Sequence, residues 1–295
     1  MVTGATGGIG QVITTELARQ GSTVVIVCRD GAKGAALRQR VATEVGADRV
    51  EVLTGDLASR RDLHRITEEF GARHQVLHLL VNNAATYTEN RLVDDGGIES
   101  QLAVNYLAGL TLTVLLLERL RLGAPSRVVN VVTAAMNDTR HIKIGRKPRP
   151  VRLDPAALED LRLINGAADF VPFEAYARTK LLTTMSGYVL AERMRDSEVT
   201  VNAVHPGLVA TAIFESITPP ALKPFGGMLN KLALTPAQGA EPVLRLATAP
   251  ELAGVTGRYF DRDSDSESPG VSYDRRLQQR LWATTQAYLT HDHAS

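Results

Sequence analysis

The sequence contains a single cysteine among its 295 residues, so the chain cannot form an intramolecular disulfide. Cys28 ends the apolar run VVIVC, a setting more typical of a buried core residue than of a nucleophile, and a lone cysteine fits a reducing compartment. No stretch approaches the roughly 18 apolar residues that a membrane span requires, and no signal peptide is visible. We therefore expect a soluble, cytoplasmic protein with no membrane span.

An excess of either charge is also lacking. The chain has 33 Lys and Arg against 32 Asp and Glu, a formal net charge of +1. Proteins that coat nucleic acid are normally clearly basic, so we expect a small-molecule substrate and no nucleic-acid partner. Internal repeats and low-complexity linkers are missing too, and we therefore treat residues 1–295 as one domain.

The start of the chain is rich in glycine. The first ten residues, MVTGATGGIG, contain four glycines, and apolar residues follow at helical spacing. This pattern predicts a strand, a glycine turn and a helix, a unit that can aim backbone N–H groups at a phosphate. A tight turn without any ligand is the alternative. A buried first strand usually has about five residues, and the short lead-in leaves open whether the native chain begins upstream of Met1.

Short apolar runs alternate with longer segments of helical period along the rest of the chain. Strands are predicted at 23–28, 50–53, 76–81, 128–132, 199–204 and 258–260, and helices at 32–45, 61–70, 98–120, 174–195 and 236–247. Strands that are apolar almost throughout indicate a parallel sheet covered on both faces. We predict a single doubly wound, Rossmann-type α/β domain with a mainly parallel sheet of about seven strands and helices on both faces. Ligands in such sheets bind beyond the carboxyl ends of the strands.

Several segments match one protein family together. They are TGATGGIG at the start, GDL at 55–57, NNAA at 82–85, YARTK at 176–180 and HPGLVAT at 205–211. In this order they resemble the short-chain dehydrogenase/reductase family over essentially the whole length. CRD at 28–30, TPAQGAEP at 235–242, GRYF at 257–260 and LW at 281–282 are similar to its retinol-dehydrogenase-like branch.

The resemblance implies a nicotinamide cofactor at the strand ends. Arg29 follows the second strand, where the adenosine ribose should lie, and a guanidinium can bind a 2′-phosphate bidentately. An acidic residue there would be the commoner mark of NAD, so we expect NADP(H), with an exposed arginine of no role as the alternative. The glycine loop also fits the spacing of the extended, sugar-nucleotide-modifying form, but NNAA and HPGLVAT resemble the short form. The cofactor-binding residues that we expect are Gly4, Thr6, Gly8, Ile9, Gly10, Arg29, Asp56, Leu57, Asn82, Asn83, Ala84, Tyr176, Lys180, Pro206, Val209 and Thr211.

Four residues are the expected reacting groups. Tyr176 and Lys180 are four apart in a predicted helix, so their side chains leave the same face. The nearby ammonium and the positive ring of an oxidised cofactor should lower the pKa of the tyrosine from its ordinary value of about 10. Thr133 stands where the family usually has serine; its hydroxyl can donate to a carbonyl, but its methyl restricts χ1. Asn105 matches an asparagine that supports a water-linked proton relay to the lysine, unless it is a helix-face residue without function. No metal ligand is expected.

Two longer segments bear on substrate choice. The insertion 136–172 carries Arg140, Lys143, Arg146, Lys147, Arg149 and Arg152 without an acidic residue among them, so it is either a solvated loop or a flap that meets an anionic substrate or carrier. Segment 212–234 is rich in apolar residues, and its prolines and glycines suggest a mobile substrate lid. Ile213, Phe214, Ile217, Phe225 and Met228 suit a bulky, largely apolar carbonyl or alcohol.

The sequence therefore predicts an NADP(H)-dependent oxidoreductase. It would interconvert a carbonyl and an alcohol on a bulky, largely apolar small molecule, as a ketone or aldehyde reductase. A non-redox enzyme for cyclisation, dehydration or isomerisation is one alternative, supported by Thr133 alone. A non-catalytic NADP-sensing protein is the other, and intact Tyr176 and Lys180 weigh against it. Substrate identity, direction and oligomeric state, a homo-oligomer included, stay open.

Overall fold

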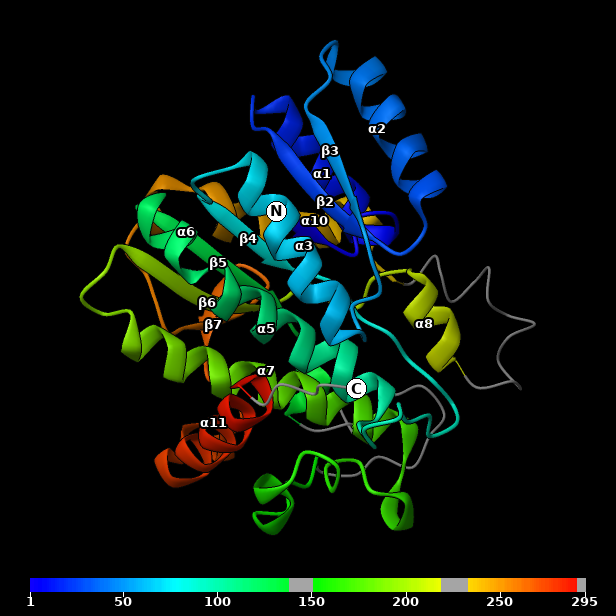
Figure 1. Ribbon diagram of the computed structural model, residues 1–295, viewed down its shortest axis with the longest axis vertical. Coiled ribbons are helices and arrows are strands. Elements are labelled where there is room, and N and C mark those ends of the chain that lie inside the picture. Colours follow the sequence, from blue (N-terminus) through cyan, green and yellow to red (C-terminus); the bar gives the residue numbers. More distant parts are fainter. Residues whose placement is uncertain (138–150, 219–232, 291–295) are drawn as a thin grey trace.

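The computed structural model describes residues 1–137, 151–218 and 233–290 (Figure 1). Its sheet runs in the order β3-β2-β1-β4-β5-β6-β7-β8, parallel except for the pair β7 and β8. The strand order reverses between β1 and β4, where ligands bind in doubly wound sheets. The strands are β1 (Val2–Thr3), β2 (Val24–Cys28), β3 (Val50–Thr54), β4 (Leu79–Asn82), β5 (Ser126–Val131), β6 (Val199–His205), β7 (Tyr259–Asp261) and β8 (Ser264–Ser266).

This architecture confirms the predicted fold class. The parallel strands fall within a few residues of their predicted positions, because most of them are short runs rich in valine and other apolar residues between segments of helical period. The edge strand β8 was not predicted. Its residues Ser264, Asp265 and Ser266 are polar, so no hydrophobic pattern marks it, and only its antiparallel pairing with β7 makes it a strand.

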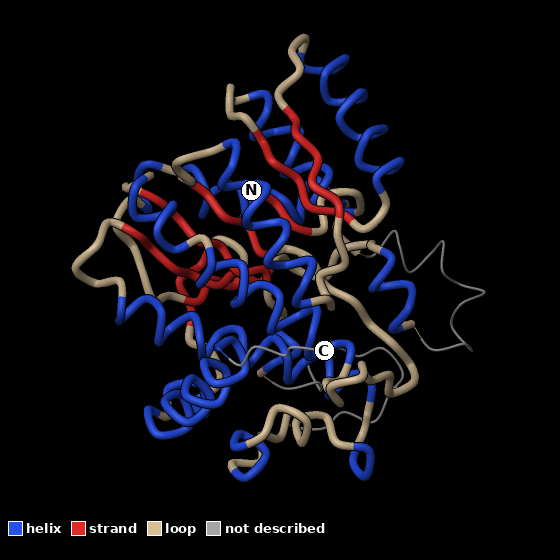
Figure 2. The backbone as a smooth tube through the Cα atoms, in the orientation of Figure 1, coloured by secondary structure: helices blue, strands red, loops and turns tan. Residues whose placement is uncertain are grey.

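Alternate side chains of each strand enter two separate cores, one on each face of the sheet. In β2, Val25 and Val27 pack on one face and Val24 and Ile26 on the other. Figure 2 shows helices on both sides of the strands. The first face is covered by α3 (Arg60–Arg73), α5 (Ala108–Leu115) and α7 (Pro172–Arg193); the second is covered by α1 (Gly8–Arg19), α2 (Gly31–Val45) and α10 (Pro236–Thr248).

The segment predicted as one helix over 98–120 is divided. It forms α4 (Ser100–Leu102), the π-helical turn η1 (Ala103–Leu107), α5 and α6 (Leu117–Leu122). The side chain of Asn105 ties this turn to the loop after β4, since its Oδ1 accepts from the N–H of Thr86 at 2.7 Å and its Nδ2 donates to the carbonyl of Thr86 at 3.0 Å. Single π turns inside helices are frequent at functional sites.

Two helices were not predicted from the sequence. The C-terminal helix α11 (Arg275–Thr290) packs against α7, with Leu281 and Trp282 buried and Arg193 of α7 lying over the Trp282 ring. The short α8 (Ala212–Ile217) follows β6. Within the described ranges, no helix is long and apolar enough to cross a bilayer. The remaining short helices are η2 (Ala134–Met136), η4 (Ala156–Glu159), η5 (Ala167–Asp169), η7 (Pro250–Leu252) and η8 (Gly270–Tyr273).

Candidate active site

The glycine turn between β1 and α1 has a backbone that larger residues would disrupt. Gly4 has φ of +64°, and a Cβ on Gly10 would lie 2.3 Å from the carbonyl oxygen of Gly4. Asn83 holds the turn, since its Nδ2 donates to the carbonyls of Thr3 at 3.0 Å and Gly4 at 3.2 Å. The residue before α1 is Gly7, which has no side chain to cap it, and the described residues supply no other cap. Uncapped N–H groups at a helix start suit a phosphate.

A cavity of about 590 Å³ opens beyond the carboxyl ends of the central strands. Most of the predicted site residues meet there, although they come from five separate parts of the chain. Those that line it are Gly4, Gly8, Ile9, Asn83, Ala84, Thr133, Tyr176, Lys180, Pro206, Val209 and Thr211.

Other predicted site residues lie outside this cavity. The side chain of Asn82 points into the protein interior, where Nδ2 donates to Asn130 at 2.9 Å and Thr113 at 3.1 Å, so only its main chain could line a ribose, and this role stays a prediction. Leu57 is buried in the core. The carbonyl of Thr6 accepts from the Gln11 side chain, which keeps this residue in the turn rather than in the cavity wall.

Arg29 directly follows β2, and its side chain is exposed to solvent. It is thus accessible to a ligand at this strand end. Its neighbour Asp30 is engaged elsewhere: its carboxylate caps α2 by accepting from the N–H of Lys33 at 3.1 Å. The adjoining carboxylate is therefore committed to a helix start, and the guanidinium of Arg29 is the remaining group at this position.

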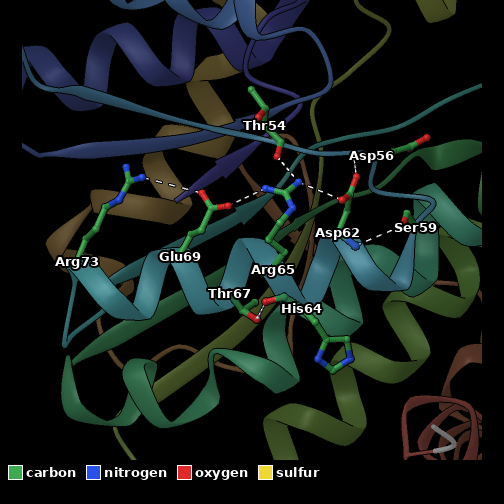
Figure 3. Close-up of polar contacts among 9 residues, drawn as sticks. All are labelled: Thr54, Asp56, Ser59, Asp62, His64, Arg65, Thr67, Glu69 and Arg73. Carbon is green, nitrogen blue, oxygen red and sulfur yellow. Dashed lines mark hydrogen bonds and ion pairs between the residues drawn. The ribbon is translucent and has the colours of Figure 1, made fainter. Parts of the chain in front are cut away.

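Asp56 stands on a loop that α3 holds in place (Figure 3). Its N–H donates to Asp62 at 2.7 Å, and this bond together with Arg65 keeps the pKa of the Asp62 carboxyl below its usual range. Arg65 also donates to the carbonyl of Thr54 at 2.7 Å, at the end of β3. The Asp62–Arg65 pair thus fixes the position of Asp56 beside the end of β2, where the N–H of Gly55 bonds to Cys28.

The expected reacting groups converge on the cavity. Tyr176 and Lys180 lie one turn apart on α7, and both line the cavity. Lys180 is 2% exposed, and its Nζ donates to the carbonyl of Val131 at 2.9 Å. Val131 ends β5 two residues before Thr133, whose hydroxyl accepts from the N–H of Ala135 at 3.3 Å. One lysine therefore joins the catalytic helix to the strand end that carries the threonine.

Burial shifts the pKa values of both Tyr176 and Lys180. It raises the pKa of Tyr176 to about 12 and lowers the pKa of Lys180 to about 8. The expected lowering of the Tyr176 pKa is wrong for the protein by itself, because desolvation of the phenolate is the dominant effect. The other expected cause, the positive ring of an oxidised cofactor, is not part of the chain.

Comparisons with known proteins agree with this arrangement. A family model described as short chain dehydrogenase matches residues 1–142. Polyprenol dehydrogenase of Mus musculus is 34% identical over 289 residues, which cover 96% of this chain and 81% of that protein. Retinol dehydrogenase 13 of Homo sapiens is 32% identical over 297 residues, covering 96% and 82%. The chain belongs to the short-chain dehydrogenase/reductase family.

Solved structures place this dehydrogenase/reductase in the same fold. An uncharacterized protein from Mycobacterium paratuberculosis matches with a TM-score of 0.72 and 25% identity, covering 98% of this chain and 91% of that one. Actinorhodin polyketide ketoreductase, solved with NADPH, matches with a TM-score of 0.66 and 21% identity, covering 88% and 94%. The predicted family and its retinol-dehydrogenase-like branch are confirmed by the curated relatives. The chain is thus an oxidoreductase of alcohols and carbonyls.

In this family member, Asn105 borders a second, very small cavity behind the catalytic lysine. That cavity measures about 10 Å³ and is lined by Asn105, Lys180 and Thr183, among others. A space of this size holds about one water molecule. The main-chain carbonyl of Asn105 accepts from the hydroxyl of Thr183 at 3.2 Å, and its side chain holds the π turn. The predicted relay stays a prediction, and its geometry allows a water between Asn105 and Lys180.

Two aromatic residues that sequence reasoning missed flank the tyrosine. The Phe173 ring stacks on the Tyr176 ring with centroids 6.2 Å apart and planes at 11°, and the Tyr87 ring meets it edge-on at 6.4 Å and 72°. Phe173 lies three residues before Tyr176 on α7, and this spacing could have revealed it. Tyr87 comes from the loop after β4, and no local signal marks it. His205 also lines the cavity, and its Nδ1 is buried without a hydrogen-bond partner in the described part of the chain.

The predicted lid is only partly described. Ile213, Phe214 and Ile217 on α8 line the cavity, as expected for a wall that meets an apolar substrate. Phe225 and Met228 lie outside the described residues. The same holds for most of the basic insertion, namely Arg140, Lys143, Arg146, Lys147 and Arg149; the exposed Arg152 is described. In the described ranges, no group of three or more His, Cys, Asp or Glu could hold a metal ion.

Proposed function

We propose that this enzyme is an NADP(H)-dependent oxidoreductase that acts as a ketone or aldehyde reductase on a bulky, largely apolar small molecule. The observation that carries the proposal is the convergence of Tyr176, Lys180 and Thr133 on one cavity whose far wall is apolar. The bound nicotinamide supplies the hydride. The chain provides the proton, the orientation of the substrate oxygen and the exclusion of water.

The residues present fit such a cofactor. Gly4, Gly7 and Gly8 of the glycine turn line the cavity without side chains, and the start of α1 at Gly8 and Ile9 faces it too. Gly4, Gly8 and Ile9 would hold the pyrophosphate, Asn83 and Ala84 the nearer ribose, and Val209 and Thr211 the nicotinamide amide.

The proton is assigned to Tyr176. With a pKa of about 12 its phenol carries its proton at neutral pH, which suits donation to the oxygen of a carbonyl under reduction. Thr133 presents a hydroxyl at the end of β5 that can donate to the same oxygen. Lys180 stabilises the phenolate that remains, since its ammonium lies one turn along the same face of α7.

The tyrosine assignment is tested by Tyr176→Phe, which keeps the ring packed between Phe173 and Tyr87 and removes only the hydroxyl. NADPH binding should persist, and turnover with saturating cofactor should fall by about 10²–10⁴. Near-parental turnover of the substrate would overturn the redox mechanism and favour a cyclisation, dehydration or isomerisation. Absence of hydride transfer to every ketone in a panel, with NADPH still bound, would favour an NADP sensor.

The preference for NADP(H) rests on Arg29. Its guanidinium is the available charged group at the end of β2, since Asp30 caps α2. Two structural neighbours, a polyketide ketoreductase and an L-sorbose reductase, were solved with NADPH, which agrees with this choice. NADPH should bind at least about tenfold tighter than NADH, or about 1.4 kcal/mol. Arg29→Ala should remove most of this difference in a fluorescence titration, and equal affinities in the parent would exclude the role.

The substrate class rests on the cavity wall. Ala135, Phe173, Ala177, Phe214 and Ile217 form a buried apolar cluster beside Tyr176. An apolar wall of this kind stabilises an apolar substrate by removing its surface from water. The curated relatives are named for polyprenol and retinol, and we propose that this enzyme likewise takes a bulky apolar alcohol or carbonyl.

We further propose a cytoplasmic location, supported by the single free cysteine. Cys28 is the single cysteine of the chain and is unpaired, a pattern that fits a compartment where thiols stay reduced. Fractionation of cells that express the full chain tests this proposal, and recovery with the membranes would contradict it.

A further inference from the structure

A buried asparagine outside the catalytic set joins three segments of the molecule. Asn165 is 3% exposed and has φ of 58°, a left-handed conformation that asparagine tolerates better than most residues. Its Nδ2 donates to Glu99 Oε2 at 2.8 Å, and its Oδ1 accepts from Arg178 at 2.5 Å. Its main-chain carbonyl accepts from Arg91 Nε at 2.8 Å. We call the contacts of Glu99, Asn165 and Arg178 the Asn165 junction.

One side of the Asn165 junction is the catalytic helix. Arg178 lies on α7 between Tyr176, the proposed proton donor, and Lys180, the proposed stabiliser of its phenolate. A second donor of the same guanidinium, Nε, bonds to the carbonyl of Arg152 at 2.7 Å. Arg178 therefore binds both ends of the stretch from Arg152 to Asn165 to the helix that carries the reacting groups.

The other side of the junction is the start of the helix that contains the π turn. Glu99 is fully buried, and its carboxylate caps α4 by accepting from the N–H groups of Gln101 at 2.8 Å and Leu102 at 3.0 Å. The π turn with Asn105 follows at once. A buried carboxylate needs several donors, and Asn165 supplies one of them from a distant part of the chain.

The segment held in this way reaches the wall of the substrate cavity. Val151 immediately precedes Arg152 and packs against the apolar cluster that contains Phe173 and Phe214. Two contacts with α11 hold the middle of the segment separately: Thr284 donates to the carbonyl of Leu158 at 2.7 Å, and Arg280 to that of Pro155 at 3.2 Å. Asn165 acts on the cavity end through Arg178: its Oδ1 accepts from Nη1 of the guanidinium whose Nε donates to the carbonyl of Arg152, next to Val151. Loss of the Asn165 side chain would therefore leave this guanidinium held at one end only and loosen its bond to Arg152, while the middle of the segment stays attached to α11.

We propose that Asn165 is a specificity-determining positioning residue, which places the 151–165 segment and Val151 against the apolar end of the substrate cavity. The proposal rests on the proposed reductase function. A substrate large enough to reach the wall next to Val151 gains contact area only when the segment is docked. A small ketone occupies the space beside Tyr176 and Thr133 and does not depend on that wall.

The test compares Asn165→Gly with the parent enzyme. Glycine keeps the left-handed backbone without strain and removes only the side-chain contacts. With NADPH saturating, kcat/KM for a bulky ketone such as decalone should fall at least about tenfold through KM, while that for cyclohexanone stays within about twofold. Hydrogen exchange should quicken over 151–165 and stay unchanged at the glycine turn. Equal losses for both ketones, or no loss for either, would overturn the proposal.

A second pair of variants, Asn165→Asp alone and combined with Glu99→Gln, distinguishes a positioning role of Asn165 from a general loss of stability. Asn165→Asp keeps the size and the acceptor for Arg178 but places a carboxylate against Glu99, so the bulky ketone should again be disfavoured. Adding Glu99→Gln removes the repulsion between the two carboxylates and supplies an amide donor, at the loss of the acceptor for the N–H of Leu102, and should restore part of the lost preference. Failure of this rescue with both variants folded would contradict the inference.

Two further comparisons complete the design. Arg162→Ala removes an exposed ion pair with Asp160 in the same segment, without touching α7, and should leave the ratio of the two ketones unchanged. An equal change in this control would overturn the role of Asn165. If the parent enzyme reduces neither ketone while binding NADPH, the proposed function fails. Parental turnover with an unchanged ratio in the Asn165 variants refutes the positioning role alone.

Discussion

Replacement of Lys180 by methionine should make the protein more stable and inactive at once. Lys180 is buried, and burial lowers its pKa from 10.5 to about 8. Such a decrease corresponds to about 3 kcal/mol, because one pKa unit is worth about 1.4 kcal/mol. At pH values below about 8, where the buried ammonium is charged, its desolvation therefore lowers the free energy of unfolding by about 3 kcal/mol.

The sign of the pH dependence follows from this shift. The unfolded chain holds a proton on the lysine up to its ordinary pKa of 10.5, whereas the folded chain releases it near 8. Between these values the unfolded state binds more protons, so the stability of the parent rises with pH relative to Lys180→Met. Below about pH 7 the variant should have the advantage, and towards about pH 10 most of that advantage should disappear.

A lost hydrogen bond reduces the gain but not its pH dependence. Lys180→Met removes the donor to the carbonyl of Val131, which costs about 1 kcal/mol at every pH. We therefore expect a net gain of about 2 kcal/mol at about pH 7, with turnover lost because the phenolate of Tyr176 has no adjacent ammonium.

The assay is urea unfolding followed by fluorescence. The chain has one tryptophan, Trp282, which is buried on α11 and reports on loss of the core. The quantity compared is the free energy of unfolding of Lys180→Met minus that of the parent, from about pH 7 to about pH 10. Lys33→Met makes the same change at an exposed lysine and should show a flat difference. A flat difference for Lys180 as well would refute the assigned cost of burial.

Two other substitutions test the rest of the site. Thr133→Ser should retain most of the activity, because the hydroxyl remains, whereas Thr133→Val should lose much of kcat in a steady-state assay despite its similar shape. Gly10→Ala should destabilise the fold by about 1–3 kcal/mol in the urea assay, since its Cβ would lie 2.3 Å from the carbonyl oxygen of Gly4. The same change at Gly7, where a Cβ would meet nothing within 4 Å, should be nearly neutral; equal losses at both positions would contradict the assigned clash.

Local chemistry explains which features were predictable. The strand β2 is apolar throughout, and β6 has valine or alanine at four of its seven positions, so the type and place of both follow from local composition. The spacing of Tyr176 and Lys180 identified one face of α7 without knowledge of any contact. The π turn at Asn105 was not visible, because no residue pattern marks it, and the bonds of that side chain to the backbone of Thr86 exist only in the folded protein.

What the sequence by itself determined is the set of properties carried by neighbours along the chain: the parallel strands, the glycine turn, the family, and the residues at each strand end. The tertiary structure decided which of those residues face the cavity. It turned Asn82 inward towards Asn130, placed Tyr87 and Phe173 against Tyr176, and gave Asn165 its partners. It also determined the pKa values of Tyr176 and Lys180. Desolvation depends on how completely the folded molecule surrounds a group, and the residues beside that group in the chain do not reveal this.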